Sequence, residues 1–126
     1  MNSKILIIAD GKKPNIIPVY QYLVEHGYKV LVSYDGTNGF NLTRREKPDL
    51  ILIDSVLSGL NGYQICSLIK NDIKYEDIFV VIFAAGAGAK EQQLANKSGA
   101  DGVLSTPVDL NELMGIVKTI NLNNQS

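Results

Sequence analysis

The chain has 126 residues, which suits one domain that is large enough to bury a core without disulfides or a structural metal. Its 12 Lys and Arg residues nearly balance 13 Asp and Glu residues, giving a net charge of -1. This balance excludes the strongly basic surface with which proteins bind nucleic acids or anionic membranes. The single cysteine, Cys66, excludes an internal disulfide and favours a reducing compartment. We therefore expect a cytoplasmic protein with no nucleic-acid or membrane partner.

The first apolar run, from Ile5 to Ala9, is too short to span a bilayer, and no small-residue cleavage pattern follows it. Its uninterrupted apolar character is typical of a parallel strand that is covered on both faces. Asp10 follows this run, and Pro14 and Pro18 come next. Because Pro18 cannot donate a hydrogen bond to the carbonyl of Pro14, the next helix must begin near Pro18 or have an irregular first turn.

Four further apolar runs alternate with amphipathic segments, and they lie at 29–33, 50–53, 78–83 and 102–104. The run at 29–33 mixes polar and apolar residues, which suits an edge strand. Asp109 predicts the N-cap of the last helix, because Glu112 stands three residues later as in a capping box. Repeated alternation of strands and helices predicts an α/β fold with a parallel sheet and right-handed crossovers. We expect a single domain over 1–126, with a core at about 4–120 and a polar tail at 121–126 that frays.

Asp54 ends the apolar run at 50–53 and opens a polar loop. A carboxylate at the carboxyl end of a buried parallel strand lies where open α/β sheets place their ligand sites. An ordinary loop acid that caps the next turn would occupy the same position, so the placement alone does not settle its role. Cys66, by contrast, falls on the apolar stripe of a helix and is expected in the core.

Several segments, taken together in their order and spacing, resemble the receiver domain of response regulators. They are 5–8 with the acid that follows, 26–30, 47–54 with 59–63, 98–102 and 107–110. The resemblance implies a flavodoxin-like (βα)5 doubly wound parallel sheet with the strand order 2-1-3-4-5, and sheets of this kind bind ligands at the point where the order reverses. The first and third strands would then be neighbours, so that acids at their ends converge.

The resemblance also implies the site. Asp54 would be the phosphoacceptor, and a Mg²⁺ ion would be held by Asp54, by acids after the first strand and by the backbone carbonyl of Val56. Receivers carry two consecutive acids after the first strand, whereas this chain has Ala9 and Asp10. Mg²⁺ usually takes one or two carboxylates and keeps several waters, so we expect Asp10 and Asp54 to bind it weakly.

Three further family positions depart from the pattern. Receivers carry a Ser or Thr at the end of the fourth strand, an aromatic residue on the fifth strand, and a Lys before the following proline. Here these positions hold Ala84, Val103 and Thr106, the last preceding Pro107. Losing a hydroxyl and an ammonium removes roughly 3–6 kcal/mol of hydrogen bonding to a charged group. Switching a two-state equilibrium takes about 5.5 kcal/mol, so we predict an impaired phosphorylation switch.

Three functional hypotheses follow. The first is a stand-alone response regulator in a phosphorelay, not an enzyme beyond assisting its own phosphorylation, with a sensor histidine kinase or phosphotransfer protein upstream and an output protein downstream. The second is a pseudo-receiver, an interaction module that ignores phosphorylation; Ala84 and Thr106 favour it, whereas Asp54 favours the first. The third is a small flavin- or nucleotide-binding enzyme. The segment 86–90 fails the Walker pattern for a phosphate loop, and we expect a mobile loop there.

Overall fold

A computed structural model describes residues 3–10, 16–86 and 88–125, with the backbone alone for 121–125. Strands and helices alternate along the chain. They are β1 (Lys4–Ile8), α1 (Ile16–Glu25), β2 (Lys29–Ser33), α2 (Gly36–Glu46), β3 (Leu50–Asp54), α3 (Gly62–Lys70), β4 (Phe79–Ala85), α4 (Ala89–Ser98), β5 (Gly102–Thr106) and α5 (Leu110–Gln125).

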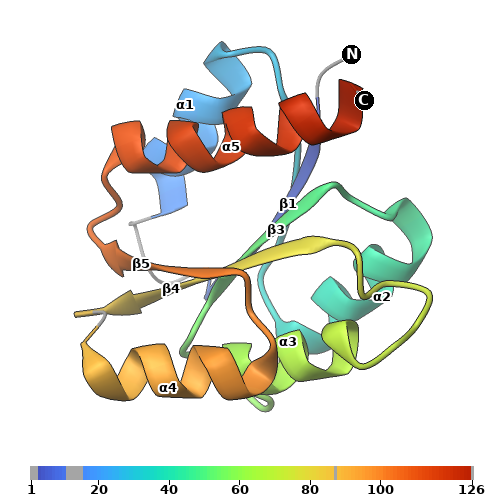
Figure 1. The fold of residues 1–126 in the computed structure, drawn as a ribbon, viewed down its shortest axis with the longest axis vertical. Helices are drawn as coiled ribbons and strands as arrows, with labels where there is room; N and C mark the ends of the chain where they lie inside the picture. Colours follow the sequence, from blue (N-terminus) through green and yellow to red (C-terminus); the bar gives the residue numbers. More distant parts are fainter. Residues whose placement is uncertain (1–2, 11–15, 87, 126) are drawn as a thin grey trace.

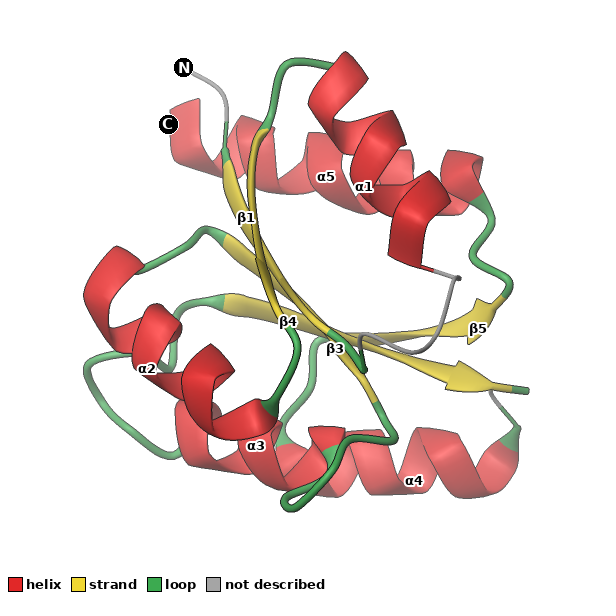
Figure 2. Cartoon of the chain, turned by 180° about the vertical axis from the view of Figure 1, so that it is seen from behind, coloured by secondary structure: helices red, strands yellow, loops and turns green. Residues whose placement is uncertain are grey.

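The strands form one parallel sheet in the order β2-β1-β3-β4-β5, which confirms the predicted flavodoxin-like topology. The mixed strand β2 lies at an edge, as its composition indicated. Helices α1 and α5 cover one face of the sheet, and α2, α3 and α4 cover the other (Figures 1 and 2). The order reverses between β1 and β3, and open sheets of this kind bind their ligands outside the carboxyl ends of the strands at such a point.

Two hydrophobic clusters, one on each face of the sheet, form the core. Alternate residues of β1 enter different clusters: Ile5 and Ile7 face the helices α1 and α5, whereas Leu6 and Ile8 belong to the opposite cluster. This division explains why the strand is apolar at every position. Cys66 is fully buried in the second cluster, and burial raises the pKa of its thiol, so its predicted place in the core is confirmed.

The helix ends agree with the sequence-based expectation at α1 and at the start of α5, and differ from it at the end of α5. Helix α1 begins at Ile16, so Pro18 lies in the first turn, where its missing N–H needs no partner within the helix. Pro14 lies outside the described residues. Helix α5 continues to Gln125, so the backbone of the expected tail extends the last helix. Asp109 caps this helix as predicted, because its Oδ1 accepts a hydrogen bond from the N–H of Glu112 at 3.2 Å.

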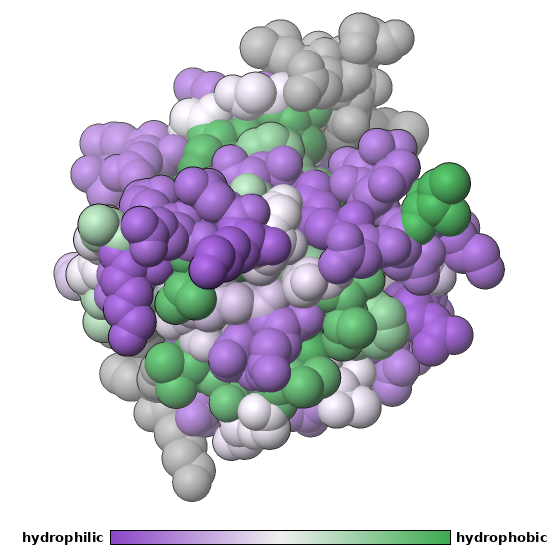
Figure 3. Space-filling view, turned by 60° about the horizontal axis from the view of Figure 1, so that its bottom comes forward, coloured by the Kyte–Doolittle hydropathy of each residue, from purple (hydrophilic) through white to green (hydrophobic). Residues whose placement is uncertain are grey.

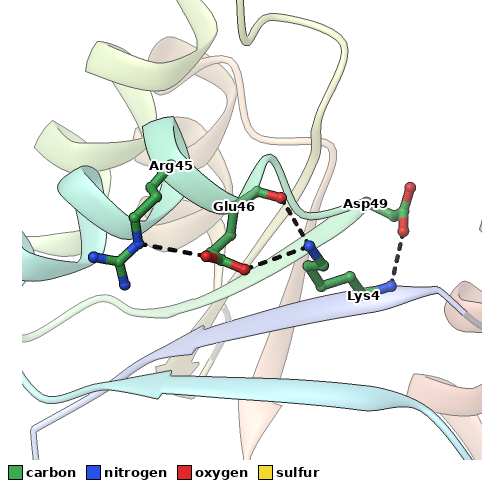
Figure 4. Close-up of polar contacts among 4 residues, drawn as sticks. All are labelled: Lys4, Arg45, Glu46 and Asp49. Atoms are coloured by element: carbon green, nitrogen blue, oxygen red, sulfur yellow. Dashed lines mark hydrogen bonds and ion pairs between the residues drawn. The ribbon is translucent and has the colours of Figure 1, made fainter.

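Polar contacts fasten the amino end of the sheet to α2 (Figure 4). The backbone N–H of Lys4 donates to Oδ2 of Asp49 at 2.8 Å, and its ammonium donates to the carbonyl and the carboxylate of Glu46 at 3.2 and 3.4 Å. The hydrogen bond from Lys4 lowers the pKa of Glu46. Arg45 approaches the second carboxylate oxygen of Glu46 at 3.4 Å. These contacts lie at the end of β1 opposite to Asp10.

A second polar network at the amino ends of β4 and β5 centres on Lys70. Its ammonium lies 2.7 Å from Oδ2 of Asp101 and donates to the carbonyls of Glu76 and Ile78 at 3.0 and 2.7 Å. The same oxygen of Asp101 accepts the N–H of Val80 at 2.9 Å. The end of α3 is thereby fixed to the sheet at the edge opposite to Asp54.

Gly62 is required where α3 starts against β3. A Cβ atom there would lie 2.9 Å from the carbonyl carbon of Asp54 and nearer still to its oxygen, and this backbone cannot move aside like a flexible side chain. We expect Gly62→Ala to lower the free energy of unfolding by about 1–3 kcal/mol, as other overpacking substitutions do. Gly115→Ala is the control, because a Cβ at Gly115 meets nothing within 4 Å.

Gly115→Ala should instead raise the free energy of unfolding by about 0.5–1 kcal/mol, because alanine favours a helix interior. Urea unfolding followed by circular dichroism measures both changes. Equal stability of the two variants would show that α3 does not pack against Asp54 as the structure has it.

Candidate functional site

Four residues predicted for the site lie along the carboxyl edge of the sheet. Asp10 follows β1, Asp54 ends β3, Ala84 precedes the last residue of β4, and Thr106 ends β5. The aligned pairs nearest to this edge are Ile8 with Ile53, Asp54 with Phe83, Ala84 with Ser105 and Ala85 with Thr106. Asp10 and Asp54 therefore follow neighbouring parallel strands, as predicted.

The carboxylate of Asp54 is held at the start of the loop between β3 and α3. Its side chain is buried, with 7% of its surface exposed, and Oδ1 accepts a hydrogen bond from the N–H of Val56 at 3.0 Å. The N–H of Ser55 donates to the carbonyl of Phe83 at 3.0 Å, and its carbonyl accepts from Gly62 at 3.0 Å. This loop is thus fastened to both β4 and α3.

The acid pair expected after β1 is reduced to one residue. Ala9 is buried in the core, with 1% exposed, and its N–H donates to the carbonyl of Ser33, whereas Asp10 is partly exposed. Across residues 3–10, 16–86 and 88–125, no group of three or more His, Cys, Asp or Glu side chains is placed to hold a metal ion. Two carboxylates with a backbone carbonyl still fit Mg²⁺, which keeps several waters.

The switch positions carry neither a hydroxyl at the end of β4 nor a charge at the end of β5. Ala84 is buried, with 4% exposed, and contributes only a methyl group. Val103 is partly buried and packs against the cluster below α2, α3 and α4. Thr106 is also partly exposed, and the peptide bond that joins it to Pro107 is cis.

Beside Asp54 lies an open groove of about 670 Å³ between α3 and α4, which sequence reasoning missed. Its walls include Ser55, Val56 and Ala84 at the end near Asp54, and Tyr63 and Leu94 along its length. Burial, reinforced by the negative charge of Glu91, raises the pKa of Tyr63, although a hydrogen bond with Ser55 opposes the shift. The groove depends on how α3 packs beside α4, and no local sequence pattern predicts this packing.

The segment at 86–90 was predicted to be a mobile loop, and this is wrong for its last two residues. Helix α4 begins at Ala89, so Lys90 lies in its first turn and borders the groove. Gly86 has a φ of 67°, which suits glycine in the turn that leaves β4. Ala87 lies outside the described residues.

The face that carries α2, α3 and α4 has no continuous apolar surface in the view of Figure 3, where hydrophobic patches alternate with hydrophilic side chains. None of the helices in the described part of the chain is both long enough and apolar enough to cross a membrane.

Comparisons with known proteins agree with this arrangement. A family model for the response regulator receiver domain matches residues 5–118. Protein PilH of Pseudomonas aeruginosa is 33% identical over 116 residues, covering 92% of this chain and 93% of that protein. The receiver domain of the Francisella response regulator 1452 has a TM-score of 0.84 at 25% identity, over 98% of this chain and 99% of its own.

A third relative shares the fold at lower identity. The receiver domain of the sensor histidine kinase PA1611 from Pseudomonas aeruginosa, whose crystal structure has a magnesium ion coordinated in the active site cleft, has a TM-score of 0.85 at 24% identity. The alignment covers 96% of this chain and 99% of that domain. By its family match and its curated relative, this chain belongs to the response regulator receiver domain family of two-component signalling.

Proposed function

We propose that this chain is a receiver whose Asp54 accepts a phosphoryl group, but whose phosphorylation does not drive the usual rearrangement of the sheet edge. The observation that carries this proposal is a buried acceptor carboxylate, held by Val56, beside a strand end that offers only Ala84.

The transfer step moves a phosphoryl group from a donor protein to the carboxylate of Asp54. A carboxylate oxygen of Asp54 attacks the phosphorus of a phosphohistidine on the donor protein, and an O–P bond forms as the N–P bond breaks. The electron pair of the broken bond stays on the imidazole nitrogen, which is then protonated from water. The N–H of Val56 keeps the acceptor carboxylate oriented for this attack.

Asp10, Asp54 and the carbonyl of Val56 are the residues that would hold Mg²⁺. A bound Mg²⁺ neutralises charge on the phosphoryl oxygens during transfer. The missing acid at Ala9 weakens the metal site. Asp54 and the carbonyl of Val56, which follow the neighbouring strand, remain as ligands. We therefore expect phosphorylation that needs higher Mg²⁺ concentrations than a site with three carboxylates would need.

The switch is impaired because the contacts that would stabilise the phosphorylated state are missing. The side chain of Ala84 cannot donate a hydrogen bond, and the side chain of Thr106 has no charge. Together the lost contacts are worth roughly 3–6 kcal/mol, about the whole free energy that a two-state switch needs. Phosphorylation adds about -1.5 to -2 charge at Asp54. No charged side chain at the end of β5 then binds the phosphoryl group.

Receiver domains interact with histidine kinases or phosphotransfer proteins and with output proteins. For this chain we propose that the output contact lies on the face around α4 and β5, where a hollow of about 240 Å³ is bordered by Gln92, Val103 and Pro107. Binding there would depend little on the phosphorylation state, because Val103 carries no aromatic ring that could change position.

A second candidate function is the pseudo-receiver, an interaction module that is never phosphorylated. The same two residues, Ala84 and Thr106, favour it. The two functions separate at Asp54 itself, because only the first requires its carboxylate to react. Receivers are generally not classical enzymes, and the family match leaves no support for a flavin- or nucleotide-binding enzyme.

Incubation with acetyl phosphate and Mg²⁺, followed by intact-protein mass spectrometry, tests acceptor function. We expect one phosphoryl adduct on the wild-type chain and none on Asp54→Asn, because the amide is not a nucleophile for this reaction. Omission of Mg²⁺ should reduce the adduct strongly. A wild-type chain that stays unmodified at saturating acetyl phosphate and Mg²⁺ would instead make it a pseudo-receiver.

Restoring the missing groups should restore the response. The double variant Ala84→Thr, Thr106→Lys places a hydroxyl at the wall of the groove and an ammonium at the end of β5. Each contact to a charged group is worth about 1.5–3 kcal/mol, so beryllofluoride, a phosphoryl mimic, should bind at least about tenfold more tightly. Tryptophan is absent, so binding is followed by NMR titration. An unchanged affinity would show that these positions do not limit the site.

A further inference from the structure

The groove between α3 and α4 is bordered by Ser55 and Val56, the two residues that follow the acceptor. Val56 donates its N–H to Asp54 and also lines the groove, and Ala84 lines it beside the end of β4. A hydroxyl at position 84 would fill part of this space, whereas a methyl group leaves it open. A phosphoryl group on Asp54 would therefore lie at the mouth of the groove rather than against a side-chain donor from β4.

One cation borders the same end of the groove. Lys90, in the first turn of α4, is exposed and lines the groove with Ser55, Val56 and Ala84. No ion pair to Lys90 forms among residues 3–10, 16–86 and 88–125. Its neighbour Glu91 also lines the groove, and its negative charge contributes to the raised pKa of Tyr63 on the opposite wall.

We propose that Lys90 is the cation that binds a phosphoryl group on Asp54, in place of the lysine that receivers carry where this chain has Thr106. The proposal rests on the acceptor function proposed for Asp54. A lysine ammonium binds a phosphoryl oxygen as a point charge and needs no fixed geometry, which suits a long side chain that reaches in from the rim. The positive charge then comes from α4, on the groove side of β4, rather than from β5.

The placement also explains why this charge does not restore the switch. Thr106 pairs with Ala85 on the β5 side of β4, whereas Lys90 belongs to α4 and lines the groove that α4 forms with α3. A contact between Lys90 and the phosphoryl group would engage α4 and not the end of β5. The site would thus bind its phosphoryl group without a contact from the position that Thr106 occupies.

The same helix offers a matched control. Lys97 also lines the groove but follows Lys90 by seven residues, about 10 Å along the helix. Its end of α4 lies away from Asp54, because a Cβ at Gly99 would touch Lys70 at the opposite edge of the sheet. Lys90 and Lys97 share a helix, an exposed position and a groove, and differ in distance from the acceptor.

The experiment measures the affinity for beryllofluoride, with Mg²⁺ present, by following amide NMR signals of the wild-type chain and of Lys90→Met, Lys90→Arg and Lys97→Met. Methionine keeps an unbranched side chain and removes the charge, and these exposed positions tolerate it in a helix. We expect Lys90→Met to weaken binding by about tenfold or more, as loss of a charged hydrogen bond does. Lys97→Met and Lys90→Arg should stay within about threefold of wild type.

Two results would overturn the role of Lys90, and they point to different causes. If wild type binds and Lys90→Met loses no more affinity than Lys97→Met, Asp54 keeps acceptor function without Lys90. If wild type shows no binding and no acetyl phosphate adduct, the proposed function itself fails. Thermal unfolding by circular dichroism confirms that each variant is folded before its affinity is compared.

Discussion

The parallel pairing of β1, β3 and β4 is the constraint on which the rest of the structure depends. These strands are buried between two layers of helices, so their side chains are apolar at nearly every position and polar groups appear only where the strands end. The pairing of Ile8 with Ile53 then sets Asp10 and Asp54 at one edge. Chemistry at this edge follows from the way the core is built.

In a receiver site, the phosphoacceptor residue and the residues of the switch are separate parts, because they lie on different strands. The backbone around Asp54 positions its carboxylate through the N–H of Val56, and this requires no particular side chain in the loop. In the function proposed above, the response to phosphorylation would depend instead on the side chains at positions 84 and 106, which are Ala84 on β4 and Thr106 on β5. Substitutions at those two positions would then remove the response while the fold and the acceptor persist, because the pairing of β4 with β5 is made by backbone groups.

The sequence was sufficient to predict the fold and the edge that carries the site, because both follow from periodic burial and from the ends of apolar runs. It also placed Asp54, Asp10, Ala84 and Thr106 at this edge, since each falls at a fixed spacing within a family pattern, whereas their roles stay predictions. It did not predict the groove between α3 and α4, which depends on the packing of two helices that are distant in sequence. The small residues at 86–89 indicated a loop, and so the helical start that places Lys90 was missed.

The most direct test is a backbone-amide NMR spectrum of the wild-type chain, titrated with Mg²⁺ and then with beryllofluoride. If Asp54 binds the phosphoryl mimic and the switch is lost, the amide signals of Asp10, Asp54 and Val56 and of the first turn of α4 should shift. Signals from Val103 and Thr106 should stay in place. Shifts that spread along β5 into α5 would contradict this account, because they would show that the sheet edge rearranges despite the missing hydroxyl and ammonium.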